Sequence, residues 1–154
     1  MGEIEYKVDD YNLGAQAFVS FVNRIWPGNY DIEKTEKALS KTINITAYDG
    51  STLTGCLRIL TDGCYFGTIT ELLVLPEYQK KGIGSRLLQL AKEYTPTMLY
   101  FGARPGLEGF YEKNGCQRSL QSYMIDKKNR NGAGRLILEL KQWRSNFMPR
   151  GFIL

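Results

Sequence analysis

The sequence predicts a mixed α/β (α+β) fold, in which helices flank a largely antiparallel central sheet. Three observations lead to this prediction. The 154 residues suit one domain with a core between two packed layers. Extended segments joined by Asp49-Gly50 and Asp62-Gly63 indicate hairpins. Apolar residues recur at helical spacing both before and after these hairpins.

The chain is expected to begin with a strand over residues 3–8, followed by two helices. Apolar residues at helical spacing over 13–25 predict the first helix, which Pro27-Gly28 ends. Asp31 is expected to cap the second helix, which runs to about residue 40.

Three strands are expected next, joined by the two hairpin turns. Apolar and polar residues alternate over 43–47, and a second extended run covers 53–60, on either side of Asp49-Gly50. Asp62-Gly63 then leads into a long strand over 65–75. These strands predict the antiparallel part of the sheet.

The remainder of the chain is expected to alternate helix and strand. Gly82-Ile83-Gly84 opens a helix whose inner face is predicted at Ile83, Leu87, Leu88, Ala91 and Tyr94. A short buried strand is predicted over 98–101, a short helix over 107–113 closed by Asn114-Gly115, and a strand over 119–125. Residues 127–134 are predicted to form a polar loop. Residues 135–147 fit a strand that passes into irregular or helical structure, or one face of a helix.

The charge distribution separates the C-terminal end from the rest of the chain. The net charge is +4, but residues 127–154 carry seven Lys and Arg against one acid, which leaves −2 for residues 1–126. We expect residues 1–126 to form the domain and residues 127–154 a basic extension, contributing the last sheet strand and a dimerisation or surface tail. A basic tail can bind nucleic acid or an anionic surface, but more often it is a solvated end, and nucleic acid is not the expected partner. Because apolar residues also lie near the C-terminal end, a homodimer remains an alternative.

Several function classes are excluded by composition. The chain contains no histidine, so neither a Ser-His nucleophile system nor a histidine zinc site can form. The three cysteines lack metal-ligand spacing and are expected to be reduced thiols in the cytoplasm. No run of about 18 apolar residues is present, so no membrane span is expected. The acidic N-terminus has no apolar signal region.

The most informative stretch is the turn after the 65–75 strand, which we call the donor loop. It reads Gln79, Lys80, Lys81, Gly82, Ile83, Gly84, Ser85 and Arg86. Glycines at a helix start let backbone N–H groups approach an anion, and the positive end of the helix dipole favours phosphate there. Lysine and arginine side chains add positive charge. The alternative is a glycine-containing helix start with exposed lysines.

Two motifs give the chain a family resemblance. Gln79-x-x-Gly82-x-Gly84, after a strand that ends Val74-x-Pro76, closely resembles the acetyl-CoA motif of the GNAT superfamily of N-acetyltransferases. Phe110-Tyr111-Glu112-Lys113-Asn114-Gly115 is similar to a second segment of that family. The resemblance covers residues 3–126 and implies a GNAT-like sheet that splays between the strands at 65–75 and 98–102. It implies acetyl-CoA as the acetyl donor and no metal.

The resemblance also implies how acetyl-CoA is held. The pantetheine arm would pair with backbone groups of Leu72, Leu73 and Val74, and the pyrophosphate would rest on N–H groups of residues 80–85. A backbone N–H near Val74 would stabilise the charge that develops on the thioester oxygen.

Two residues are candidates for proton transfer. Tyr111 is the candidate acid by resemblance, and the alternative is an aromatic residue that packs the short helix against the sheet. Glu71 is the candidate base, direct or through water, and the alternative is an ordinary surface carboxylate on a strand. An alkylamine has a pKa near 10, so a base or a water chain must remove its proton before it can attack.

The acceptor is predicted to be a small-molecule amine. By resemblance, the loop between the first two helices shapes its site, where Trp26 and Tyr30 can stack on the amine and Asp31 can attract its ammonium group. A peptide or protein amine remains an alternative acceptor. A catalytically silent CoA-binding regulatory module remains an alternative function.

Overall fold

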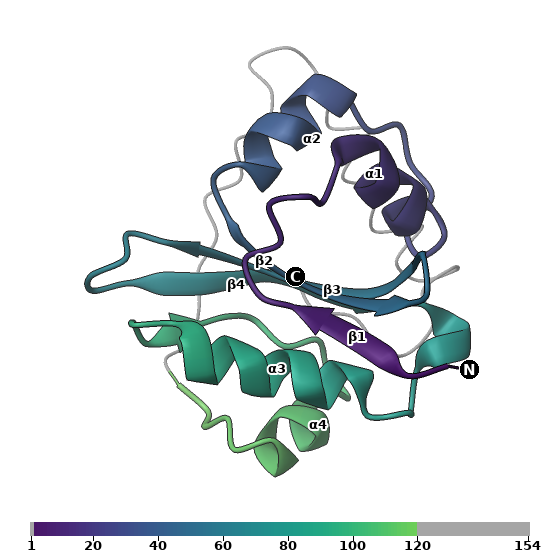
Figure 1. The fold of residues 1–154 in the computed structure, drawn as a ribbon. Helices are drawn as coiled ribbons and strands as arrows, with labels where there is room; N and C mark the ends of the chain where they lie inside the picture. The colour runs from purple at the N-terminus through teal and green to yellow at the C-terminus, as the bar shows by residue number, and fades with distance from the viewer. Residues whose placement is uncertain (1, 120–154) are drawn as a thin grey trace, which may run out of the picture. The chain divides into compact units, whose positions relative to one another are not determined.

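The computed structural model describes residues 2–119, which fall into two compact units, residues 2–103 and 104–119. The first unit holds a five-stranded sheet and three α-helices (Figure 1). Its elements are β1 (Ile4–Lys7), α1 (Ala15–Asn23), α2 (Ile32–Leu39), β2 (Ile43–Asp49), β3 (Thr52–Thr61), β4 (Gly67–Val74), the 3-10 turn Pro76–Tyr78, α3 (Ile83–Tyr94) and β5 (Leu99–Tyr100). Each unit is described by itself.

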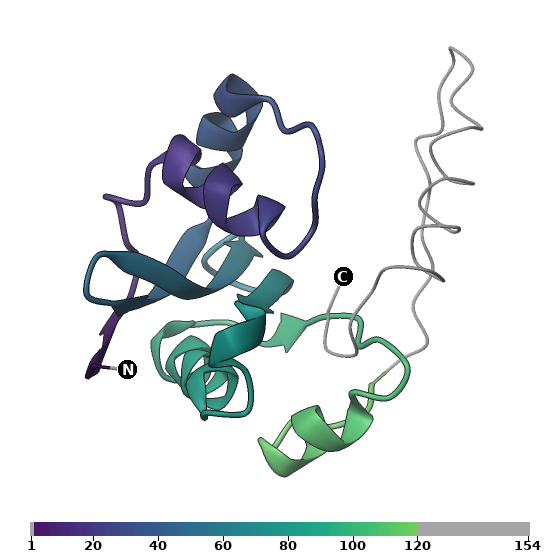
Figure 2. The same ribbon diagram turned by 90° about the vertical axis from the view of Figure 1, so that its right-hand side faces the viewer.

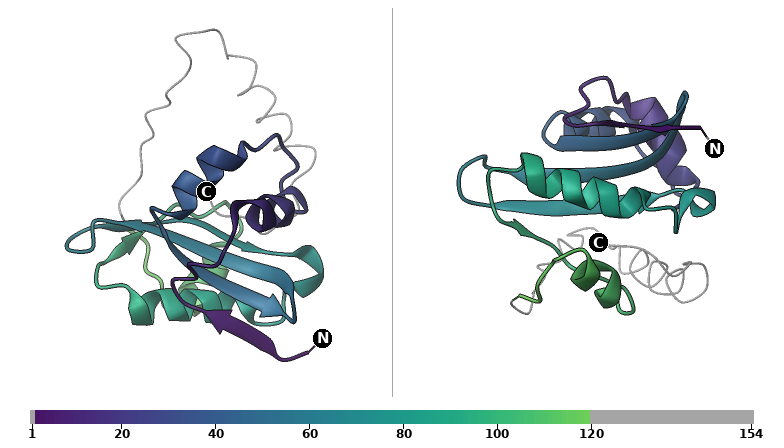
Figure 3. Two further views of the ribbon diagram at one scale, coloured as in Figure 1. Left: turned by 45° about the horizontal axis from the view of Figure 1, so that its top comes forward. Right: turned by 60° about the horizontal axis from the view of Figure 1, so that its bottom comes forward.

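The sheet has the strand order β1-β2-β3-β4-β5. The first four strands pair antiparallel, and β5 pairs parallel with β4. Helices α1 and α2 cover one face of the sheet and α3 covers the other (Figures 1 and 3). The predicted mixed, largely antiparallel sheet flanked by helices is therefore confirmed.

Strands β4 and β5 meet at one end only, which is the predicted splay. Gly67 pairs with Leu99 and Thr68 with Tyr100, whereas β4 continues to Val74 without pairing to β5; Figure 2 shows the first unit from the side. A Cβ atom on Gly67 would lie 2.7 Å from Leu99 Cδ2 and 2.8 Å from Thr97 Oγ1, so a side chain at this position would force these two side chains to shift. The side chains packed around this pairing thus lie close to the glycine.

The two faces of the sheet differ in chemistry because the register sorts the side chains. Ile45 lies opposite Leu57 and Ala47 opposite Gly55. The Cβ position of Gly55 lies 3.0 Å from Ile83 Cγ2 of α3, so these residues form the apolar core under α3. The alternate residues, which include Thr46 and Arg58, therefore face α1 and α2. We call this second side the polar face.

A buried carboxylate organises part of the polar face. Asp10 accepts hydrogen bonds from Thr46 Oγ1 at 2.8 Å, from the Tyr48 phenol at 2.9 Å and from the Asn12 N–H at 3.1 Å. Both Asp10 and Thr46 are buried. Burial, followed by the hydrogen bond to Asp10, raises the pKa of Tyr48 to about 12. The segment that follows β1 is thereby fixed to β2.

The predicted start of the long strand at residue 65 is wrong, because the hairpin between β3 and β4 has a wider turn than expected. Asp62 Oδ1 accepts the N–H groups of Cys64, Tyr65 and Phe66 at 2.8–3.0 Å. These bonds widen the turn, so β4 begins at Gly67 rather than at Tyr65. Tyr65 is 87% exposed.

Two burial predictions after β4 are also wrong. Tyr94 is 60% exposed because α3 ends there, and Leu90 is buried in its place. Met98 is 69% exposed, and β5 spans only Leu99 and Tyr100. The predicted short strand exists, but it is not buried.

The second unit contains α4 (Glu108–Lys113). Gly115 follows it with φ +75°, which matches the predicted helix end at Asn114-Gly115. The predicted strand at 119–125, the loop at 127–134, the segment 135–147 and the boundary after residue 126 reach beyond the described residues. Within residues 2–119, no helix has the length and apolar character needed to cross a bilayer.

Candidate functional site

The free side of β4 is the first component of the site. Leu75 N–H donates to Thr54 O at 2.9 Å, and Leu73 lies opposite Cys56 on β3. Because backbone groups alternate in an antiparallel pair, those of Leu73 point to β3 and those of Leu72 and Val74 point away from it. Among the described residues, no strand pairs with β4 on that side beyond Thr68. We call this side, over residues 69–74, the open edge of β4.

The donor loop closes back on the end of β4. Gln79 Nε2 donates to Val74 O at 3.0 Å, so the Gln79 side chain binds the chain's own backbone. It occupies the carbonyl of Val74 and leaves the N–H of that residue on the open edge. Gln79 thus fixes the point at which the strand passes into the loop.

The start of α3 is open to solvent and unusual in its backbone. Gly82 is the N-cap residue, with φ +85°, and no side chain caps the helix. Nothing lies within 4 Å of where a Cβ of Gly82 would be. The first helical bond runs from Arg86 N–H to Gly82 O at 3.0 Å, so the N–H groups of Ile83, Gly84 and Ser85 precede it and have no partner within the helix.

The basic side chains of the donor loop differ in their surroundings. Lys81 Nζ lies 5.2 Å from the centre of the Tyr78 ring, which is fixed by a 3.0 Å hydrogen bond to Asp49 Oδ2. Lys80 is exposed, with a positive φ of 60°. Arg86 Nη1 lies 3.6 Å from Glu93 Oε1, so its side chain extends along α3 away from the loop. The two lysines are therefore the cations of the loop that stay nearest its glycines.

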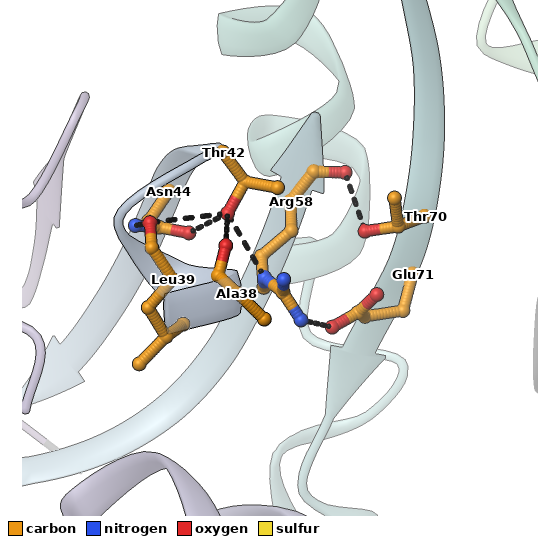
Figure 4. A network of polar contacts seen from close by, with 7 residues as sticks. All are labelled: Ala38, Leu39, Thr42, Asn44, Arg58, Thr70 and Glu71. Carbon is orange, nitrogen blue, oxygen red and sulfur yellow. Dashed lines mark hydrogen bonds and ion pairs between the residues drawn. The ribbon is translucent and has the colours of Figure 1, made fainter. Parts of the chain in front are cut away.

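Glu71 lies on the polar face of β4, where it forms an ion pair with Arg58 of β3 (Figure 4). Arg58 Nη1 and Glu71 Oε1 are 2.5 Å apart, and the two side chains are 11% and 14% exposed. Glu71 is therefore not the exposed surface carboxylate that the alternative interpretation describes. Its role as a base stays a prediction. Arg58 was missed from the sequence, where a cation between Leu57 and Ile59 of an apolar strand was the available signal.

The predicted acceptor loop lies on the same side of the sheet as Glu71. The Tyr30 phenol donates to Trp26 O at 2.8 Å. Burial raises the pKa of Tyr30, and the negative charge of Glu71 raises it further. The Tyr30 phenol therefore lies within the electrostatic reach of Glu71. Asp31 Oδ1 accepts the Lys34 N–H at 2.9 Å and caps α2, as predicted. Its role towards an ammonium group stays a prediction.

Tyr111 belongs to the second unit, on α4. It is 5% exposed, and its ring meets that of Phe110 edge to face with 4.9 Å between the centroids. Burial is the main cause that raises the pKa of Tyr111. The contact with Phe110 lies within α4, and both the packing of α4 against the sheet and the role of Tyr111 as a proton donor stay predictions.

Within residues 2–119, no three His, Cys, Asp or Glu side chains gather where they could hold a metal ion.

Half of the chain matches a known protein family. The model of the acetyltransferase (GNAT) domain family matches residues 41–117, a stretch that contains the open edge of β4, the donor loop and α4. A protein of Gibberella zeae named as an acetyltransferase is 31% identical over 77 residues, which are 41% of this chain and 44% of that protein. The match thus spans less than half of that relative.

Solved structures extend the likeness to the fold. A GNAT-family acetyltransferase of Streptococcus pneumoniae superposes with a TM-score of 0.64 at 25% identity, over 82% of this chain and all of that one. The aminoglycoside N-acetyltransferase AAC(6')-Iy, solved with a bisubstrate analogue, gives a TM-score of 0.65 at 12% identity, over 83% and 100% of the two chains. At that identity the second likeness is one of fold.

Proposed function

Because the chain belongs to the GNAT acetyltransferase family, we propose that it transfers the acetyl group of acetyl-CoA to the primary amine of a small molecule by direct attack in one ternary complex. The observation that carries the proposal is the open edge of β4 beside the uncapped start of α3. An acyl-CoA has matching parts, an amide-bearing arm and an anionic pyrophosphate.

The donor loop binds the pyrophosphate in this proposal. The N–H groups of Ile83, Gly84 and Ser85 supply hydrogen-bond donors at the positive end of the helix dipole. Lys80 and Lys81 supply charge. The empty space next to Gly82 lets an anion approach the backbone, which fits such a group.

The open edge of β4 aligns the acyl end. The backbone groups of Leu72 face away from β3 and pair with an amide of the arm, whereas those of Leu73 are turned to β3. The Val74 N–H donates to the thioester oxygen, where negative charge develops during attack. Bound acetyl-CoA supplies an acyl group activated as a thioester.

Glu71 receives the amine in this proposal. An alkylamine is an ammonium ion at neutral pH because its pKa is about 10, so it is attracted by a carboxylate and must lose a proton before it attacks. Glu71 Oε1 is held by Arg58, and Oε2 binds the amine N–H and passes the proton to water. The C–N bond then forms as the C–S bond breaks, and the nitrogen loses its second proton to water through Glu71. Tyr111 keeps the role implied by resemblance, proton donor to the leaving sulfur, and regains a proton from water.

The acceptor proposed here carries a single amine on an apolar body. Arg58 offsets the charge of Glu71, so this pair contributes little net negative charge to attract a polycation. Trp26 and Tyr30 offer aromatic surface at the acceptor loop, and Asp31 adds one carboxylate there.

The proposal is tested by measuring thiol release from acetyl-CoA with a panel of amines. The panel contains arylalkyl and alkyl monoamines, polyamines, an aminoglycoside, and peptides with a free N-terminus or a lysine. We expect the highest kcat/KM with the apolar monoamines, and a mass spectrum of the acetylated product. A preference for peptides contradicts the acceptor class alone. If the protein binds acetyl-CoA tightly but no amine in the panel causes thiol release, the result contradicts acetyl transfer and favours the catalytically silent CoA-binding module.

A further inference from the structure

A row of polar side chains crosses three neighbouring strands on the polar face. Asn44 of β2 lies opposite Arg58 of β3, and Arg58 lies opposite Glu71 of β4. Residues directly opposite each other on adjacent strands have their side chains on the same face. The row ends at the carboxylate that the proposed function assigns to the acceptor amine (Figure 4).

Arg58 is held at two of its nitrogens and on one face of its guanidinium. Its Nη1 donates to Glu71 Oε1 at 2.5 Å, and its Nε donates to Thr42 Oγ1 at 3.2 Å. The guanidinium carbon lies 5.3 Å from the centre of the Phe18 ring of α1. A planar guanidinium fixed in this way has little freedom to rotate.

Thr42 and Asn44 connect Arg58 to the C-terminal end of α2. A hydroxyl group has one proton, and the Thr42 hydroxyl lies 2.8 Å from Asn44 Oδ1 and 3.3 Å from the carbonyls of Ala38 and Leu39. The shortest contact assigns the proton to Asn44, which leaves the Thr42 oxygen to accept from Arg58. Asn44 is buried, and its Nδ2 donates to Leu39 O at 3.0 Å. The chain of hydrogen bonds therefore ends on the backbone of α2.

Glu71 is fixed at one oxygen and available at the other. Oε1 accepts from Arg58, and no described residue donates to Oε2. The register between β3 and β4 shifts between Arg58 and Ile59 and leaves Thr70 as the extra residue. The Thr70 hydroxyl donates to Arg58 O at 3.3 Å, so this bulge next to Glu71 is tied to Arg58 as well.

We propose that Arg58 is a positioning residue for acetyl transfer, which holds Glu71 so that Oε2 meets the acceptor amine, and that Thr42 and Asn44 fix Arg58 for this purpose. The inference rests on the proposed function, in which Glu71 binds the amine. A purely structural pair would hold β3 and β4 together and affect turnover only through the amount of folded protein. The two roles differ in whether the effects of Arg58 and Glu71 on kcat depend on each other.

The test is a double-mutant cycle in steady-state kinetics, with an amine that the wild-type protein acetylates. Arg58→Met and Glu71→Gln are each expected to lower kcat by about 100-fold, the lower end of the range for a group that assists proton transfer. The KM for acetyl-CoA is expected to change less than about twofold, since the donor loop is untouched. The double variant is expected to match Glu71→Gln alone, because Arg58 acts through Glu71.

Two further variants keep the test informative where Arg58→Met folds poorly. Thr42→Val retains both charges and removes the acceptor for Arg58 Nε together with the donor to Asn44 Oδ1, and it is expected to lower kcat about threefold. Lys7→Met is the matched control, since Lys7 is also a strand cation with an ion pair to Glu5 and an aromatic contact with Tyr48. It is expected to leave kcat unchanged. All rates are divided by the folded fraction from circular dichroism.

Two outcomes overturn the inference while acetyl transfer stands. One is a double variant whose loss in kcat is the product of the two single losses. The other is Thr42→Val with wild-type kcat. A wild-type protein that acetylates no amine overturns the proposed function, and the role of Arg58 with it.

Discussion

Arg58 and Glu71 face each other across β3 and β4, and their ion pair is almost closed off from solvent. Asn44 continues the row on β2. A buried charge needs a partner, because the energy of removing it from water is recovered only through close contacts. This pair therefore predicts stability as well as reactivity.

Removing one member of the pair should cost more stability than removing both. Arg58→Met leaves Glu71 without its partner and is expected to lower the free energy of unfolding by about 2 kcal/mol, below the roughly 3–5 kcal/mol of a fully buried pair because some exposure remains. Arg58→Met with Glu71→Leu should recover most of this loss. Urea denaturation followed by circular dichroism measures both. A double variant less stable than Arg58→Met would contradict the expectation.

Gly82 should be intolerant of a side chain because of its backbone rather than its surroundings. Gly82→Ala places a Cβ in a left-handed conformation, which costs about 1–2 kcal/mol, and a shift of the loop to relieve this strain should raise the KM for acetyl-CoA. Gly14→Ala is the matched control, since Gly14 is also an N-cap with open space but has φ −73°. Equal effects of the two variants on KM would remove the argument for the donor loop.

Asp31 combines a visible cap with a predicted role towards the amine, and two substitutions separate them. Asp31→Ala should lower the free energy of unfolding by about 1 kcal/mol through loss of the cap, and Asp31→Asn, which can still cap, should not. Asp31→Asn is expected to raise the KM of a cationic amine about threefold, and less so at high salt, because exposed charges are screened. An unchanged KM at low salt would leave Asp31 with the cap alone.

Tyr48 predicts a specific pH dependence of stability. Its phenol ionises near pH 10 in an unfolded chain but has its pKa raised to about 12 in the fold. Between these values the unfolded state has lost the proton that the native state retains, so stability falls as pH rises. The difference in unfolding free energy between wild type and Tyr48→Phe should be constant below about pH 9 and shrink above pH 10. Urea titrations across this range, with Tyr65→Phe as control for losing an exposed phenol, check it, and a constant difference would contradict it.

The main elements of the first unit follow from local sequence, because periodicity and turn residues act over a few positions. Asp31 capped α2 as expected, and Gly82 opened α3. The start of β4 could not be predicted from local sequence. Three backbone N–H groups donate to Asp62 and hold Tyr65 and Phe66 in the turn. Such a turn competes with the strand propensity of these aromatic residues, and propensity alone does not decide between them.

The part of the site that depends on local backbone conformation could be predicted from the sequence. The part that depends on how neighbouring strands are aligned could not. A glycine-bearing turn between strand and helix marks the donor loop in the sequence itself. Arg58 and Glu71 stand 13 positions apart, and only the pairing of β3 with β4, which includes the bulge at Thr70, brings them into contact. Asn44 joins them through a second register.

The central claim is that the acetyl group passes directly from acetyl-CoA to the amine, without a covalent acyl-enzyme. Initial rates over a matrix of acetyl-CoA and amine concentrations test it most directly. Direct attack in a ternary complex predicts double-reciprocal lines that intersect, with an amine-dependent rate of thiol release. Parallel lines, together with thiol release in the absence of amine, would show a covalent intermediate and contradict the account.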